Sequence, residues 1–174
     1  MKKILLFALV MMCALPVAAQ DDIRRFEGEI AVGLARSTHL LDYDNQLLGW
    51  KLTTELRYNL RTLPMDFGLQ ISLGNYRYDD STLHYNEIYN ASYILAVADY
   101  NFRRNKNVSC FVGVGAGMSD TEFRFNETAM CVMPRVGVEF WRHLRLTASY
   151  YIADKEHSGI ALTVGVVFGG GNKK

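Results

Sequence analysis

The stretch PRVGVEFWRHLRLTASYY, residues 134–151, indicates the fold of the whole chain. It reads as two strands joined by a very short turn. Apolar residues take every second position, namely Val136, Val138, Phe140, Leu144, Leu146, Ala148 and Tyr150. Charged, small or hydroxyl residues lie between them, namely Arg135, Gly137, Glu139, Arg145, Thr147 and Ser149. Successive side chains of a strand point to opposite faces, so the hairpin has one apolar and one polar face.

The same alternation recurs along the chain and predicts eight antiparallel strands, at residues 26–36, 48–60, 65–74, 91–102, 108–118, 131–140, 144–151 and 160–168. It is strictest over residues 48–60. The tyrosine- and asparagine-rich segment 75–90 is expected to be a long loop. The chain has 174 residues, which fits one domain spanning residues 20–174 with a polar tail at 169–174.

Three features favour a membrane barrel over a soluble lipocalin-like barrel, in which the apolar face would line the inside. Short connections at 61–64, 103–107 and 141–143 alternate with longer ones, like the periplasmic turns and external loops of outer-membrane barrels. Glycine collects on the polar faces, and small residues suit the narrow lumen of eight strands. Aromatic residues gather near the ends of the apolar faces, as membrane girdles do. We therefore predict an all-β, up-and-down transmembrane barrel of eight strands with the polar face inside.

The first nineteen residues are expected to be a signal peptide. A basic start at Lys2 and Lys3 precedes an apolar run at 4–12 and a small-residue cleavage signal at 17–19. The alternatives are an anchor helix and a lipoprotein modified at Cys13. Without the two lysines the formal charge changes from +1 to −1, which gives no electrostatic reason to expect nucleic-acid binding. No later apolar run approaches the ~20 residues of a spanning helix.

Several segments carry a family resemblance. The sequences PRVGVEF and HLRL in the hairpin, ADYNF at 98–102 and VGVGAGMS at 112–119 resemble small outer-membrane β-barrel proteins of the OmpA/OmpX kind, particularly those of Bacteroidetes-like bacteria. The resemblance covers essentially the whole mature chain. It implies a monomer in the outer membrane, with membrane lipid and the barrel assembly machinery as partners. Such barrels often end on the final aromatic residue, whereas six residues follow Phe168 here.

Charged residues on the inward face form the main candidate constellation. The lumen ion-pair candidates are Glu29, Lys51, Glu55, Arg57, Asp99, Arg135, Glu139 and Arg145. Both signs are present, so we expect salt bridges to fill the barrel. The alternative, a gated path for small ions, needs a continuous wet channel.

The two cysteines of the mature chain are expected to be free thiols. Cys110 falls on the apolar face of its strand and Cys131 on the polar face of the next. A disulfide needs Cα atoms within ~7 Å, and the expected register keeps these two apart.

Catalytic chemistry is not expected. Some small outer-membrane barrels modify lipid A, but none of the histidines (His39, His84, His143 and His157) falls beside a serine on a lipid-facing strand. No metal-ligand spacing or cofactor motif is present, and VGVGAG lies in a strand without the helix that a dinucleotide site needs. The outer loops remain, with several tyrosines and an Asp80-Ser81-Thr82 triplet that resembles a short O-glycosylation signal. We therefore expect a non-enzymatic role in envelope integrity, or in adhesion to a host or surface ligand.

Overall fold

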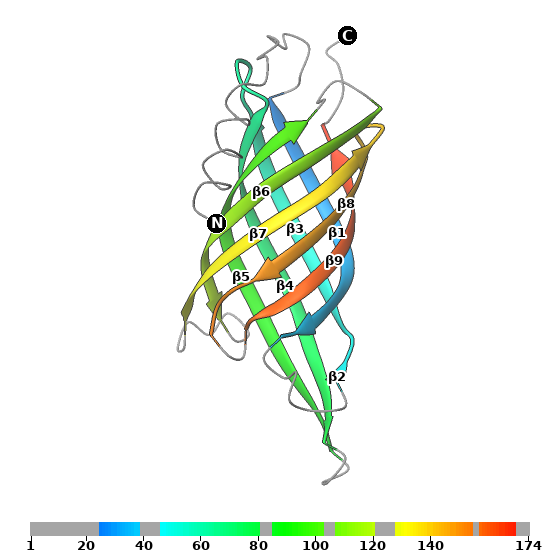
Figure 1. Cartoon of the computed structure of the whole chain (residues 1–174), viewed down its shortest axis with the longest axis vertical. Coiled ribbons are helices and arrows are strands. Elements are labelled where there is room, and N and C mark those ends of the chain that lie inside the picture. Colours follow the sequence, from blue (N-terminus) through cyan, green and yellow to red (C-terminus); the bar gives the residue numbers. More distant parts are fainter. Residues whose placement is uncertain are drawn as a thin grey trace, which may run out of the picture.

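The computed structural model describes residues 25–38, 46–80, 85–102, 107–120, 128–154 and 157–169. They form nine strands: β1 (Phe26–Ser37), β2 (Gln46–Leu47), β3 (Gly49–Asn59), β4 (Met65–Asp80), β5 (Tyr85–Phe102), β6 (Val108–Asp120), β7 (Ala129–Phe140), β8 (Leu144–Tyr151) and β9 (Gly159–Phe168). Strand β2 pairs with β4 over two residues only. The other eight close a ring, because each pairs antiparallel with its neighbour and β9 pairs back onto β1 (Figure 1). The predicted eight-stranded barrel is confirmed.

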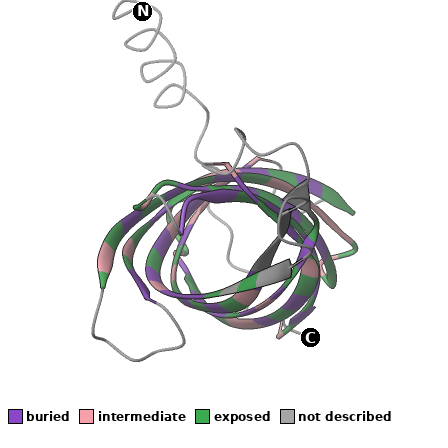
Figure 2. Ribbon diagram, turned by 90° about the horizontal axis from the view of Figure 1, so that it is seen from below, coloured by how far each residue is buried: buried purple, intermediate pink, exposed green. Residues whose placement is uncertain are grey.

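Side-chain burial alternates with period two along the strands. Buried and exposed positions alternate without a break through β9, and the ring of strands carries both classes along its length (Figure 2). The exposed positions are apolar: Val32 is 60% exposed and Val164 is 47% exposed. The buried positions hold charged and hydroxyl residues, and Arg57 is 1% exposed. The apolar face therefore points outward, as a barrel in lipid requires and a lipocalin-like barrel does not.

One element differs from the expectation. The segment 75–90 was expected to be a loop, but β4 continues to Asp80 and β5 begins at Tyr85, with pairing down to Asp80↔Tyr85. This β4–β5 hairpin extends well beyond the other strands (Figure 1). Pairing with β3 stops at Gly74 and pairing with β6 stops at Ser92. Beyond those points the two faces no longer separate lipid from lumen, so the alternation that marks a membrane strand disappears.

The predicted short turn at residues 141–143 is confirmed. Trp141 and Arg142 have φ values of 49° and 62°, and the N–H of His143 donates to the carbonyl of Phe140 at 3.0 Å. Positive φ at both central residues is the type I′ arrangement, whose twist matches that of the flanking strands. The turn is usually made with asparagine and glycine, so this hairpin holds two side chains in a left-handed conformation.

Both cysteines of the described chain are free, with Cys110 exposed and Cys131 buried. The reading from face parity is confirmed, because Cys110 pairs with Val138 and Cys131 pairs with Gly117. Among the described residues no helix is long and apolar enough to cross a membrane.

Candidate functional site in the barrel lumen

The end of the lumen nearest the short turns contains a dense group of charges. We call it the lumen charge cluster: Glu27, Glu29, Glu55, Arg57, Asp99, Arg135, Glu139 and Arg145. The members come from β1, β3, β5, β7 and β8. Each lies at an inward position of its strand, so in the closed barrel their side chains point toward one another. Seven of the eight ion-pair candidates from the sequence meet here.

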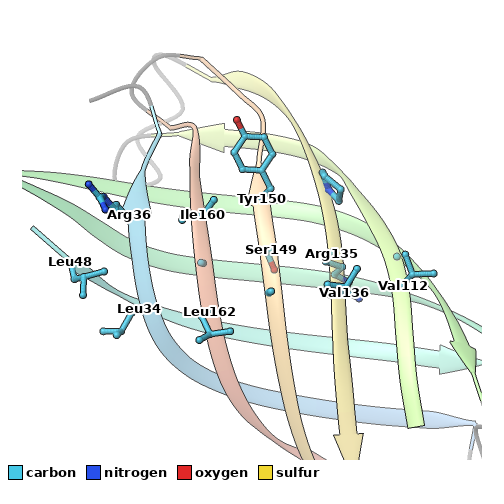
Figure 3. Close-up of a pocket in the computed structure, with 14 residues that line it drawn as sticks. Leu34, Arg36, Leu48, Val112, Arg135, Val136, Ser149, Tyr150, Ile160 and Leu162 are labelled. Atoms are coloured by element: carbon cyan, nitrogen blue, oxygen red, sulfur yellow. The ribbon is translucent and has the colours of Figure 1, made fainter. Parts of the chain in front are cut away.

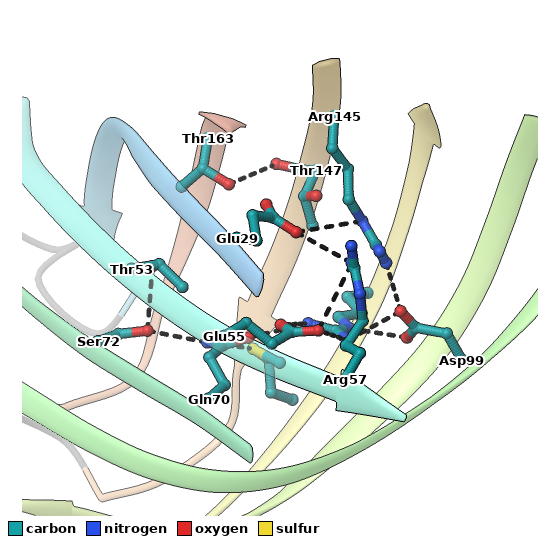
Figure 4. A network of polar contacts seen from close by, with 12 residues as sticks. Glu29, Thr53, Glu55, Arg57, Gln70, Ser72, Asp99, Arg145, Thr147 and Thr163 are labelled. Carbon is teal, nitrogen blue, oxygen red and sulfur yellow. Dashed lines mark hydrogen bonds and ion pairs between the residues drawn. The ribbon is translucent and has the colours of Figure 1, made fainter. Parts of the chain in front are cut away.

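Arg135 is the best-satisfied cation of the cluster. Its partners Glu55, Gln70 and Asp99 point into the lumen (Figure 4). Its Nε and Nη2 donate to the two carboxylate oxygens of Asp99, both at 2.8 Å. Nη1 and Nη2 donate to the two oxygens of Glu55 at 2.5 and 2.8 Å. Nη1 also donates to Oε1 of Gln70 at 2.9 Å. Two bidentate carboxylates and one amide thus match the five N–H groups of a guanidinium.

Arg145 connects the cluster to an aromatic ring. It donates to Asp99 and lies 3.7 Å from Glu29 and 3.9 Å from Glu139, measured between side-chain N and O atoms. The guanidinium carbon lies 3.5 Å from the ring centroid of Phe111, within cation–π range. That ring in turn covers Gly137, where an added Cβ would lie 2.4 Å from it. A glycine on the polar face of β7 therefore makes room for the stacked pair.

Arg57 is less completely paired than the other two arginines. It donates to Glu29 at 3.0 Å, and its nitrogens lie 3.6 Å from Glu27 and from Glu55. Within the described residues, its Nε and Nη2 are buried without a hydrogen-bond partner. Five carboxylates surround three guanidinium groups, so the cluster carries more acidic groups than basic ones. Arg57 is held by one hydrogen bond to Glu29 and by longer contacts to Glu27 and Glu55, and not by a bidentate partner.

Lys51 lies apart from the cluster, contrary to the expectation that it takes part in the lumen ion pairs. In the described structure its ammonium sits over two rings, 3.9 Å from the centroid of Tyr93 and 3.4 Å from that of Tyr151. The reason is its position on β3. Lys51 is four residues from Glu55 toward the outer end of the strand, where the inward neighbours are aromatic and apolar.

The lumen therefore changes character along its axis. A hydroxyl and amide layer follows the charge cluster, with Gln70 donating to Ser72 at 2.8 Å and to the hydroxyl of Tyr151 at 3.2 Å. The outer half is apolar and aromatic, built from Ala35, Ala91, Tyr93, Leu95, Val97, Cys131, Met133, Tyr151 and Ala161. At its end, the hydroxyl of Tyr93 donates to the carbonyl of His157 at 2.6 Å. The described side chains thus fill the barrel from one end toward the other.

Residues that the sequence reasoning did not single out hold this arrangement together. Gln70, Phe111 and Tyr151 contact the charged side chains directly. The alternation of faces along their strands places all three inward, so their facing could be predicted. Their contacts with residues on distant strands could not be predicted from the sequence.

The described histidines do not form a nucleophilic site with the neighbouring serine. Nδ1 of His157 lies 2.6 Å from Oδ1 of Asp154, which suggests two members of a triad. The hydroxyl of Ser158, however, donates to the backbone carbonyl of Asp154 at 2.7 Å and accepts from the N–H of Ala153 at 3.0 Å. These bonds shape the loop between β8 and β9. In the described segments no group of three or more His, Cys, Asp or Glu residues could hold a metal. His39, His84, Ser81 and Thr82 lie outside the described residues.

Comparison with known proteins agrees with the barrel geometry. Residues 5–169 match the family model for the outer membrane protein β-barrel domain. The Neisserial surface protein A structure aligns with a TM-score of 0.54 at 16% identity, covering 83% of this chain and 95% of that one. The N-terminal β-barrel domain of Pseudomonas aeruginosa OprF aligns with a TM-score of 0.51 at 14% identity, covering 84% and 99%. No curated protein sequence matches this chain. The chain belongs to the family of the outer membrane protein β-barrel domain, and its place is the outer membrane.

Proposed function

We propose that this protein is a non-enzymatic outer-membrane barrel that presents the β4–β5 hairpin to the outside as a binding and adhesion surface. The observation that supports the proposal most is the length of the hairpin. Six residue pairs, from Asn75↔Asn90 to Asp80↔Tyr85, lie beyond the last pair that β5 makes with β6. A hairpin of this length is not needed to cross the membrane, because strands of 9–11 residues suffice.

The hairpin also continues past the neighbouring strand. Among the described residues, the pairing of β5 with β6 ends at Ser92, whereas its pairing with β4 continues to Tyr85. A hairpin that extends past its neighbour can receive an extended segment of another protein by β-strand addition. Ile88 is 52% exposed on this hairpin and supplies an apolar contact.

The filled lumen supports the non-enzymatic part of the proposal. The charge cluster, the amide layer and the aromatic outer half use the inward side chains for packing, so we assign them to barrel stability. A barrel braced in this way also suits a role in envelope integrity. The alternative, a lipid-A-modifying enzyme, is tested by comparing lipid-A mass profiles of cells with and without the gene. A changed profile would overturn the non-enzymatic assignment.

Truncating the hairpin tests the adhesion proposal. Replacing residues 77–88 by Asn-Gly keeps the pairs that belong to the barrel and removes most of the hairpin extension. We expect the truncated barrel to keep its heat-modifiable migration on gels, while cells carrying it bind immobilised host extracellular matrix much less than cells with the full chain. Ile88→Lys should weaken binding, whereas Ile152→Lys, at a residue with a similar 48% exposure at the end of another strand, should not. Equal binding by full-length and truncated proteins would overturn the proposal.

We also infer that residues 1–19 are removed as a signal peptide, which supplies the export that an outer-membrane location needs. N-terminal sequencing of the protein isolated from outer membranes tests this. A mature chain starting at Gln20 is expected, and one that retains Met1 would contradict it.

A further inference from the structure

A proline interrupts the wall of the barrel between β7 and β8. The two strands pair from Phe140↔Leu144 to Arg135↔Ser149, and pairing resumes only at Val132↔Ile152. At that bridge the N–H of Val132 donates to the carbonyl of Ile152 at 2.9 Å, and the N–H of Ile152 donates to the carbonyl of Val132 at 2.8 Å. Hydrogen-bonded pairs recur every second residue, so Pro134 and Tyr150 should form the next such pair. Proline has no N–H, and the carbonyl of Tyr150 cannot receive its bond from residue 134.

This position has consequences because the barrel lies in a membrane. In hydrocarbon no water is present to satisfy a backbone carbonyl, so leaving one unpaired is strongly unfavourable. A donor brought by a bound molecule would remove that cost. We call the break in pairing between β7 and β8 at Pro134 the seam. The seam therefore favours a lipid that carries a hydroxyl or an amide over one that carries only hydrocarbon.

The outer surface is hollowed beside the seam. A hollow of about 710 Å³ runs across β1, β9, β8, β7 and β6, with Leu34, Val136, Ala148, Ile160 and Leu162 among its lining residues (Figure 3). This size is typical of small-molecule sites, at roughly 300–1,000 Å³. Ala148 leaves space between its larger neighbours Val136 and Leu162, with which it pairs across the strands. The lining is apolar and suits an acyl chain.

A cation stands at the rim of the hollow. Arg36 is exposed, pairs with Ile160 and lines the same hollow. It lies at the end of β1 away from the short turns. Because short turns face the periplasm in such barrels, this end lies in the outer leaflet. Arginine is the side chain best suited to hold a phosphate.

We propose that this hollow binds one molecule of lipid A, the phosphorylated glycolipid anchor of lipopolysaccharide in the outer leaflet. One acyl chain lies on the apolar floor around Ala148. A phosphate pairs with Arg36. A hydroxyl or amide of the same lipid donates to the carbonyl of Tyr150 at the position that Pro134 leaves open. The three features lie in one hollow and call for one amphiphilic, anionic lipid.

Native mass spectrometry of the full barrel released from detergent tests the proposal. Wild type mixed with lipid A should retain one molecule. Arg36→Gln should lower the retained fraction about tenfold, since a charge-assisted hydrogen bond is lost. Ala148→Phe fills the floor and should abolish retention, and Pro134→Val supplies the missing N–H and should reduce it. Arg61→Gln, an exposed arginine at a turn, and Ala116→Phe, in a smaller hollow on another part of the wall, should bind as wild type does.

Heat-modifiable migration shows whether each variant is folded. Arg36→Gln removes the charge of an exposed side chain without adding bulk, so the test does not depend on the bulkier variants. Phosphatidylglycerol serves as the second probe. Retention of lipid A that is equal in wild type, Arg36→Gln and Arg61→Gln would overturn the proposal. Retention of phosphatidylglycerol in preference to lipid A would overturn it as well.

Discussion

Replacing Arg135 by methionine should destabilise the barrel more than any other single loss of charge in the lumen. The change removes five hydrogen bonds, to Glu55, Asp99 and Gln70, and leaves two buried carboxylates with less compensation. Breaking a buried ion pair from one side costs about 3–5 kcal/mol. Asp99 keeps its bond from Arg145, and Glu55 stays 3.6 Å from Arg57. These remaining contacts place the expected loss at the lower end, about 3 kcal/mol.

Urea unfolding of the refolded barrel measures this loss. Tryptophan fluorescence and heat-modifiable migration follow the transition, and an unchanged slope shows that the midpoint reports stability. Adding Glu55→Gln to Arg135→Met should recover part of the loss, about 1–2 kcal/mol, because one uncompensated charge disappears. Arg61→Gln is the matched control and should stay within about 0.5 kcal/mol of wild type. A loss below about 1 kcal/mol, or a double variant no more stable than the single one, would refute the reasoning.

Three further changes probe other parts of the barrel in the same unfolding assay. Gly137→Ala should lower the free energy of unfolding by at least about 2 kcal/mol, because its Cβ would lie 2.3 Å from the carbonyl oxygen of Leu146. Gly28→Ala is the control and should be nearly neutral, because nothing lies within 4 Å of its added Cβ. Equal effects of the two changes would contradict the packing described. Arg142→Gly should raise stability by about 1 kcal/mol because glycine adopts the φ of 62° without strain, and a lower urea midpoint would argue against strain in this turn. Lys51→Met should change the free energy of unfolding by less than about 1 kcal/mol, because the loss of the cation–π contacts is offset by the removal of a buried charge. A loss as large as that of Arg135→Met would show that Lys51 acts as an ion-pair partner.

The alternation of apolar and polar residues was enough to predict the barrel. A strand between lipid and lumen has a different environment on each face. The residue type at each position of β9 therefore indicates whether that side chain points to lipid or to the lumen. The hairpin beyond Gly74 and Ser92 has no such contrast. Its strands could not be told from a loop, and the length of β4 and β5 was missed for that reason.

The candidate charges were predictable as inward residues, but their partners were not. Which side chains meet across a barrel depends on the tilt and stagger of the strands, which the pattern along one strand does not contain. Arg135 on β7 reaches Glu55 on β3, and Lys51, four residues from Glu55, instead meets rings from β5 and β8. The interrupted seam at Pro134 shows the same limit. Proline is visible in the sequence, but the carbonyl that loses its donor follows only from the register.

The facing of β9 in a bilayer is the most direct test of an outward apolar face and a packed lumen. Spin labels placed one at a time along Gly159–Phe168, in barrels reconstituted into bilayers, report collisions with lipid-soluble oxygen and with a water-soluble nickel complex. We expect high oxygen accessibility at Ile160, Leu162, Val164, Val166 and Phe168, and low accessibility to both reagents at the positions between them. Oxygen accessibility with the opposite phase would contradict the outward apolar face. High accessibility to the nickel complex at the intervening positions would contradict a filled lumen.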